Sequence, residues 1–140
     1  MTCFIDTSFF FALASANDPD HERVREVFEQ FDPERLPELW LTTNHVVMET
    51  IRLTKRQLGH EAAVQMGKRL YGERLARIHW TTPKEEREAF DYLAHHADKR
   101  YSPVDCVSFV VMEANGLRDA LTIDRDFTHR FVARPGPRPR

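Results

Sequence analysis

The run Cys3-Phe4-Ile5-Asp6-Thr7-Ser8-Phe9-Phe10-Phe11 sets the fold class of this chain. The apolar run at its start is long enough for a short buried strand, which we place at residues 2–5. Asp is unfavourable inside such a strand, so Asp6 marks the end of the strand or a function. Ser8 is placed to cap a helix over residues 9–16. A strand that passes through a polar turn directly into an apolar helix is typical of an α/β domain.

Strand and helix patterns then alternate to the end of the chain. Further strands are expected at residues 39–42, 75–79, 119–123 and 130–133. Helices are expected at residues 21–31, 45–58, 61–71 and 83–97, and from 103 to Asn115-Gly116, with a loop at 32–37. Asn44 is the expected N-cap of the 45–58 helix and Gly59 ends it, while Thr82 and Ser102 open capping boxes. This order predicts an α/β layer structure.

Length and composition indicate one domain. The 140 residues form a core-sized unit over 1–133, followed by a flexible, basic, Pro-rich tail at 134–140. Two cysteines are too few for a disulfide framework or a zinc site. No apolar run reaches the roughly 18 residues that a membrane span needs, and no basic segment precedes the apolar N-terminal run as in a signal peptide. We therefore expect a cytoplasmic protein with no membrane association.

Four carboxylates lie beside strongly apolar runs: Asp6, Glu49, Asp105 and Asp124. Asp6 and Asp124 follow expected strands, and ligands bind beyond the carboxyl ends of strands in open α/β sheets. Acidic side chains brought close together repel one another unless a cation joins them. Oxygen ligands without a Cys or His cluster favour Mg²⁺, with Mn²⁺ as a substitute. Such a cage is suited to phosphodiester hydrolysis, so the pattern predicts a metal-dependent nuclease.

Several of these acidic residues also have a simpler interpretation, whereas Asp6 is harder to explain without a function. Asp105 stands three residues after Ser102, so its role could be limited to completing a capping box. Glu49 has Arg52 three residues on and could form a surface ion pair. Asp124 and Asp126 could be turn residues with hydrogen bonds to nearby backbone. The four acids together, and not any one of them, favour a site.

Four segments resemble the motifs of PIN-domain ribonucleases in order and spacing. They are Phe4-Ile5-Asp6-Thr7-Ser8-Phe9, Val46-Val47-Met48-Glu49-Thr50, Ser102-Pro103-Val104-Asp105-Cys106-Val107-Ser108-Phe109 and Thr122-Ile123-Asp124-Arg125-Asp126-Phe127. The length is similar to that of VapC-type toxins of bacterial toxin–antitoxin pairs. The resemblance implies a PIN-like three-layer sandwich with a mainly parallel, about five-stranded central sheet flanked by helices. It also implies a Mg²⁺-dependent endoribonuclease, a VapB-like antitoxin partner and a homodimer.

Site residues follow from the resemblance position by position. Asp6, Glu49, Asp105 and Asp124 match the catalytic and metal-binding acids, with Asp126 as an additional acid. Thr7 and Ser8 match the small hydroxyl residues after the first acid, which order a metal water or cap the helix, and capping is the favoured role for Ser8. Thr122 matches the hydroxyl before the last acid, which holds a carboxylate in place. One metal is expected mainly at Asp6 and Asp105, and a second near Glu49. Hydrolysis would leave a 5′-phosphate on structured RNA such as the ribosomal sarcin–ricin loop or tRNA.

Other functions stay open at this point. A PIN nuclease in RNA processing without a toxin role fits the same motifs, and a non-catalytic RNA- or protein-binding module would use the acids structurally. A metal-free ribonuclease that uses histidine is a further alternative. A group of basic residues could track phosphates or could form an ordinary solvated face. These are Arg52, Lys55, Arg56, Lys68, Arg69, Arg74 and Arg77.

Overall fold

A five-stranded sheet forms the centre of the structure, a computed structural model that describes residues 2–139. Its strands are β1 (Cys3–Ile5), β2 (Trp40–Thr43), β3 (Arg77–His79), β4 (Asp119–Thr122) and β5 (Val132–Pro135). They lie in the order β3-β2-β1-β4-β5, and every neighbouring pair is parallel. The expected α/β class with a mainly parallel, five-stranded sheet is therefore confirmed.

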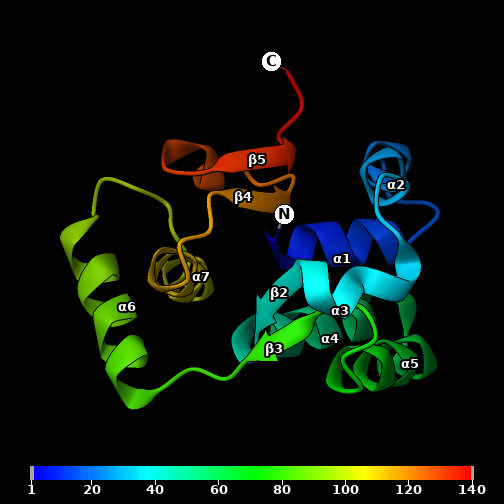
Figure 1. Ribbon diagram of the computed structural model, residues 1–140, viewed down its shortest axis with the longest axis horizontal. Coiled ribbons are helices and arrows are strands. Elements are labelled where there is room, and N and C mark those ends of the chain that lie inside the picture. The colour runs from blue at the N-terminus through cyan, green and yellow to red at the C-terminus, as the bar shows by residue number, and fades with distance from the viewer. Residues whose placement is uncertain (1, 140) are drawn as a thin grey trace.

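Helices cover both sides of this sheet. They are α1 (Thr7–Ala14), α2 (His21–Phe28), α3 (Leu36–Leu39), α4 (Asn44–Leu58), α5 (His60–Tyr71), α6 (Pro83–His95) and α7 (Pro103–Ala114), with short 3-10 turns η1 (Pro33–Arg35) and η2 (Arg125–His129). In Figure 1, α6 and α7 lie to the left of the strands and α1, α2 and α5 to the right. The arrangement is the expected three-layer sandwich.

The order of the strands reverses at β1, in the middle of the sheet. From β1 the chain passes to β2 and β3 on one side, and then returns across the sheet to β4 on the other side of β1. β1 and β4 are thus the neighbouring strands at which the strand order reverses, and in open α/β sheets ligands bind beyond the carboxyl ends of such a pair. Side chains that follow β1 and β4 converge at this edge.

Aromatic packing holds the strands in place. Trp40 of β2 is almost fully buried and meets the rings of Phe9, Phe28 and Phe31 edge to face, with centroids 5.5–5.9 Å apart. Phe109 of α7 meets the ring of Phe127 edge to face, with centroids 5.1 Å apart. Because both faces of the central strands β1, β2 and β4 are buried, their positions and the directions of the residues that follow them are firmly set.

Several helix ends differ from expectation. Thr43, not Asn44, caps α4 by accepting a hydrogen bond from the Val46 N–H, and Asn44 instead accepts one from the Thr81 N–H. The cap assigned to Ser8 is also wrong, because α1 begins at Thr7, two residues earlier than expected, and Asp6 is at the cap position. The expected loop at 32–37 contains η1 and the start of α3. Pro33 and Pro37 each stand at the first positions of these short helices, which suits their fixed φ.

Other ends agree with the sequence. Thr82 and Ser102 both open complete capping boxes, with Glu85 and Asp105 as the third residues. Gly59 ends α4 with φ of 97°, a backbone conformation that side chains other than glycine's rarely adopt. Within residues 2–139, every helix falls short of the length and apolar character required to cross a bilayer.

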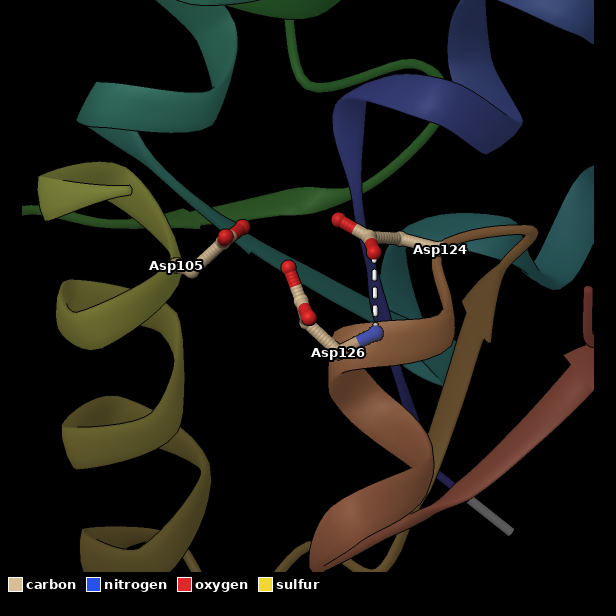
Figure 2. Close-up of side chains that lie close together, drawn as sticks. All are labelled: Asp105, Asp124 and Asp126. Atoms are coloured by element: carbon tan, nitrogen blue, oxygen red, sulfur yellow. Dashed lines mark hydrogen bonds between the residues drawn. The ribbon is translucent and has the colours of Figure 1, made fainter. Parts of the chain in front are cut away.

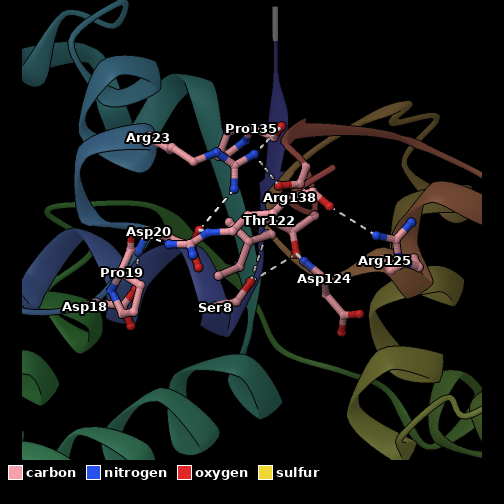
Figure 3. A network of polar contacts seen from close by, with 12 residues as sticks. Ser8, Asp18, Pro19, Asp20, Arg23, Thr122, Asp124, Arg125, Pro135 and Arg138 are labelled. Atoms are coloured by element: carbon pink, nitrogen blue, oxygen red, sulfur yellow. Dashed lines mark hydrogen bonds and ion pairs between the residues drawn. The ribbon is translucent and has the colours of Figure 1, made fainter. Parts of the chain in front are cut away.

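The C-terminal segment packs against the domain. β5 continues to Pro135, so the first two residues of the expected tail pair with β4. Beyond it, Arg138 donates hydrogen bonds to the Asp20 carboxylate and the Pro19 carbonyl, as Figure 3 shows. Arg23 donates to the carbonyls of Pro135 and Gly136. The domain boundary at 133 and the flexibility of the tail stay predictions, and their outer ends, Met1 and Arg140, lie outside the described residues.

Candidate metal centre

Three carboxylates meet at the carboxyl edge of the sheet. Oxygen atoms of Asp105, Asp124 and Asp126 all lie within 4.8 Å of one another. Asp105 comes from the first turn of α7, Asp124 is the residue that caps η2, and Asp126 belongs to the first turn of η2. Figure 2 shows the three side chains directed into one space between these elements. Segments that are distant in sequence thus bring three negative charges together.

Local hydrogen bonds fix the directions of two of these carboxylates. The Ser102 N–H donates to one oxygen of Asp105 over 3.0 Å, and the Asp126 N–H donates to one oxygen of Asp124 over 2.9 Å. The capping-box interpretation of Asp105 and the turn interpretation of Asp124 are therefore both correct. They do not compete with a site, because each of these bonds engages only one oxygen of its carboxylate.

Asp6 borders this cluster from β1 and is held by two hydroxyls. Its side chain is buried, with 4% exposure, and one oxygen accepts hydrogen bonds from Ser8 Oγ at 3.2 Å and Thr122 Oγ1 at 3.0 Å. The same two hydroxyls accept hydrogen bonds from the backbone N–H groups of Ile123 and Asp124. Asp6 is thereby connected to the turn that carries Asp124, although it lies outside the group of three.

Glu49 approaches from α4 and lies between two pockets. One pocket is lined by Thr7, Glu49, Arg52, Leu53 and Arg56, and the other by His45, Met48, Glu49, Arg52 and Val104. Thr7 is buried, and its hydroxyl lies 3.4 Å from that of Thr50 on α4. The simpler interpretation of Glu49 is not supported, because no ion pair joins it to Arg52 anywhere in residues 2–139.

Burial and mutual repulsion disfavour the charged forms of these acids. Burial raises the pKa of Asp105 to about 7, and the charges of Asp6 and Asp124 contribute to the rise. Burial also raises the pKa of Asp6 to about 6, together with the charges of Asp124 and Glu49. The pKa of Asp124 is raised in turn by burial and by the charges of Asp126 and Glu49. A cation placed among them would reverse these shifts.

The residues fit a hard divalent cation. The cluster offers carboxylate oxygens only, and the two cysteines, Cys3 and Cys106, are buried. Such a donor set suits Mg²⁺ or Mn²⁺ better than zinc or copper, which favour nitrogen or sulfur. Only a few carboxylates are needed, because Mg²⁺ retains several of its waters in protein sites.

Two features of the site were missed or ranked too low by the sequence. Asp126 was a secondary candidate, yet the structure places it in the group of three, with Asp105 and Asp124. Capping was the favoured role for Ser8, but its hydroxyl instead joins Asp6 to Thr122 at the end of β4 and to the Ile123 N–H. The available signal was the position of Ser8 two residues after Asp6. Only the parallel pairing of β1 with β4 shows that this hydroxyl reaches residue 123.

Replacing Ser8 by Ala is expected to lower the free energy of unfolding by about 1–3 kcal/mol, because the Ile123 N–H loses its acceptor. Ser108→Ala is the matched control. Its hydroxyl is buried but donates only to a carbonyl of its own helix, so its loss is expected to cost under about 0.5 kcal/mol. Urea unfolding of both variants measures the difference. Equal stabilities would contradict a bridging role for Ser8.

Comparison with known proteins agrees with the fold. The PIN domain family matches residues 3–130. The chain is 36% identical to the 23S rRNA-specific endonuclease VapC20 of Mycobacterium tuberculosis over 125 residues, or 89% of this chain and 91% of that protein. A crystal structure of that protein, described as a sarcin–ricin loop cleaving toxin, has a TM-score of 0.82 and covers 91% of this chain and 94% of its own, at 34% identity. A DNA-bound VapBC structure from Salmonella typhimurium shares the fold at 16% identity and a TM-score of 0.66, covering 95% of this chain and 97% of that one.

Proposed function

The chain belongs to the PIN-domain family, and from that premise we propose that it is a Mg²⁺-dependent endoribonuclease, the toxin of a VapBC-type toxin–antitoxin pair. The observation that carries this proposal is the cluster of Asp105, Asp124 and Asp126 at the carboxyl ends of β1 and β4, where the strand order reverses. Its position is the ligand-binding position of open α/β sheets, and its charge requires a cation.

In this proposal, Asp105, Asp124 and Asp126 hold the cation, with Asp6 and Glu49 beside them. Mg²⁺, when bound there, supplies the positive charge that lowers the pKa of a water and offsets the charge that develops on the phosphate. The buried hydroxyl of Thr122 and that of Ser8 keep Asp6 in one orientation. An acidic site held in this way is organised before the substrate arrives, so little reorganisation is needed during the reaction.

Water is the nucleophile in this scheme, and its oxygen adds to the scissile phosphorus while the bond to the 3′ oxygen breaks. The products are a 5′-phosphate and a 3′-hydroxyl. Their identity separates this mechanism from that of a histidine ribonuclease, in which the 2′-hydroxyl attacks and leaves a cyclic phosphate. Within residues 2–139, the histidines nearest the site are engaged elsewhere: His45 pairs with Glu86, and His129 bonds to the Tyr101 hydroxyl.

We assign a structured loop of 23S rRNA as the substrate, in preference to tRNA. Support comes from the similarity to VapC20 over nearly the full length of both chains. That similarity also supports a toxin role, an inhibitory antitoxin partner and action in the cytoplasm, where ribosomes are found. A homodimer is part of the same proposal and rests on the family alone.

Incubating the purified chain with ribosomes in Mg²⁺ or in EDTA tests the proposal. We expect discrete cuts in 23S rRNA that need Mg²⁺ and carry 5′-phosphates, as mapped by ligation-dependent sequencing of the new ends. Expression in a bacterium should stop growth, and coexpression of the neighbouring antitoxin gene should restore it. Cleavage that persists in EDTA with cyclic-phosphate ends would overturn the metal site. Cleavage without growth arrest would instead favour an RNA-processing nuclease.

A further inference from the structure

Unpaired basic side chains gather on one part of the molecule. Residues 50–80, which form most of α4, all of α5 and β3, contain seven Lys or Arg residues but only two acidic ones. None of the seven makes an ion pair or a side-chain hydrogen bond within residues 2–139, whereas arginines such as Arg23, Arg25 and Arg138 are all paired. In a chain of net charge −2, this is a local excess of available positive charge.

Two of these residues lie beside the acidic site. Arg52 lines both pockets that flank Glu49, and Arg56 lines the larger of the two. The larger pocket, of about 300 Å³, also includes Thr7, the neighbour of Asp6, and the smaller, of about 190 Å³, includes Val104, the neighbour of Asp105. Either pocket is large enough for a phosphate group. Both lead from α4 to residues adjoining the candidate metal ligands.

Helix geometry places the two guanidinium groups in a row. Arg52 follows Glu49 by three residues and Arg56 follows Arg52 by four, so all three side chains share one face of α4. Their spacing along the helix axis is about 4.5 Å from Glu49 to Arg52 and about 6 Å from Arg52 to Arg56. The step from Arg52 to Arg56 is comparable with the separation of neighbouring phosphates in an RNA strand. A guanidinium with free N–H groups binds a phosphate through two hydrogen bonds.

Positive charge beside the acidic site would offset the repulsion between its carboxylates and the RNA backbone. The acids at the site repel the phosphates on either side of the scissile bond, and a cation among the ligands offsets this only locally. Positive charge is therefore needed beside the site as well as in it. Glu49 does not neutralise Arg52, since the two form no ion pair within the described residues.

We propose that Arg52 and Arg56 form a phosphate-binding subsite that holds the RNA backbone adjacent to the scissile bond. The inference deepens the proposed nuclease function and rests on it. The two arginines are positioning residues: they bind flanking phosphates and set the register of the strand over the acids. They read no base, so they contribute affinity and placement, and not sequence preference.

Arg52→Gln and Arg56→Gln test the subsite, with Arg118→Gln as the matched control. Arg118 is exposed, unpaired through its side chain in residues 2–139, and stands just before β4, at the end of the sheet opposite the acids. Binding is measured by fluorescence anisotropy in the cleavage-deficient Asp105→Asn background, with a labelled RNA stem–loop of the 23S sarcin–ricin sequence as the probe. Each variant at α4 is expected to weaken binding by about 5–10-fold and to reduce the slope of log K against log salt by about 0.7–1.

Cleavage kinetics of the same substitutions in the active chain separate positioning from chemistry. The loss should fall on KM, with kcat changed less than about threefold. Arg52→Lys retains the charge and should recover most of the salt slope but not the full affinity, because a lysine binds phosphate through a single point charge. Thermal melting establishes that each variant is folded, and the lysine variant provides the test if glutamine disturbs the helix.

The two proposals fail in different ways. Unchanged affinity and salt slope in both glutamine variants, with cleavage still lost in Asp105→Asn, would overturn the subsite and leave the nuclease standing. RNA binding that depends on Arg52 and Arg56, in a chain that cuts no RNA with Mg²⁺, would retain the subsite and overturn the nuclease. A loss of binding in Arg118→Gln equal to that at α4 would mean that charge acts over the whole surface, and would also overturn the subsite.

Discussion

Asp105→Asn is expected to lower Mg²⁺-dependent RNA cleavage by about 10³-fold, which corresponds to roughly 4 kcal/mol of transition-state stabilisation. The substitution keeps the size of the side chain and one carbonyl oxygen, so the Ser102 N–H can still find an acceptor. What is lost is a negative charge within 4.8 Å of both Asp124 and Asp126. Initial cleavage rates on 23S rRNA at saturating Mg²⁺ measure the effect.

Two further substitutions make this test specific. Asp119→Asn is the matched control, because Asp119 begins the strand that leads to Asp124 and so lies at the opposite end of the sheet. It should retain cleavage within about twofold. Asp126→Asn should lower the rate by about 10–100-fold, between the other two, since its ligand atoms belong to the cluster but its acid was only a secondary match to the family motifs. Full activity in Asp105→Asn would remove the metal site from the mechanism.

The sheet could be predicted from the sequence because its buried strands are apolar runs with polar residues at their ends. The strand-like runs that begin at Cys3 and Asp119 are apolar because they are covered on both faces, and each is followed at once by polar residues. The capping boxes at Thr82 and Ser102 depend on side chains only three residues apart. Local causes of this kind can be read from a sequence.

Contacts between distant segments could not be read in the same way. Thr43 and Asn44 are both good capping residues, and the choice between them depends on Thr81, which takes Asn44 as its acceptor from 37 positions away. Similarly, Ser8 reaches Ile123 only because β1 pairs with β4. The sequence supplied the acids, but their grouping into Asp105, Asp124 and Asp126, with Asp6 turned toward Thr122, is a property of the packed sheet.

The metal-free protein is expected to lose stability as the pH rises from about 4 to about 7. In the unfolded chain an Asp ionises with a pKa near 3.9, whereas burial holds the pKa of Asp105 at about 7 and that of Asp6 at about 6. Between these values the folded state binds more protons than the unfolded state, so the free energy of unfolding falls with rising pH. Below about pH 4 both states are protonated and no penalty remains. Above about pH 7 the penalty is complete.

Asp105→Asn should remove most of the contribution that residue 105 makes to this pH-dependent loss of stability, because an amide stays neutral at every pH in this range. At about 1.36 kcal/mol per pKa unit, we expect the variant to be more stable than the parent at pH 8 by about 2–4 kcal/mol, and equal to it at pH 4. The difference between the two melting curves cancels histidine pairs such as His79 with Glu85, which both chains retain. Millimolar Mg²⁺ should then stabilise the parent at pH 8 and have little effect on the variant.

A parent that melts at the same temperature at pH 5 and pH 8, with and without Mg²⁺, would mean that these acids ionise freely and hold no cation. The same substitution is thus expected to stabilise the metal-free fold and to lower cleavage steeply, as a site built from mutually repelling charges requires.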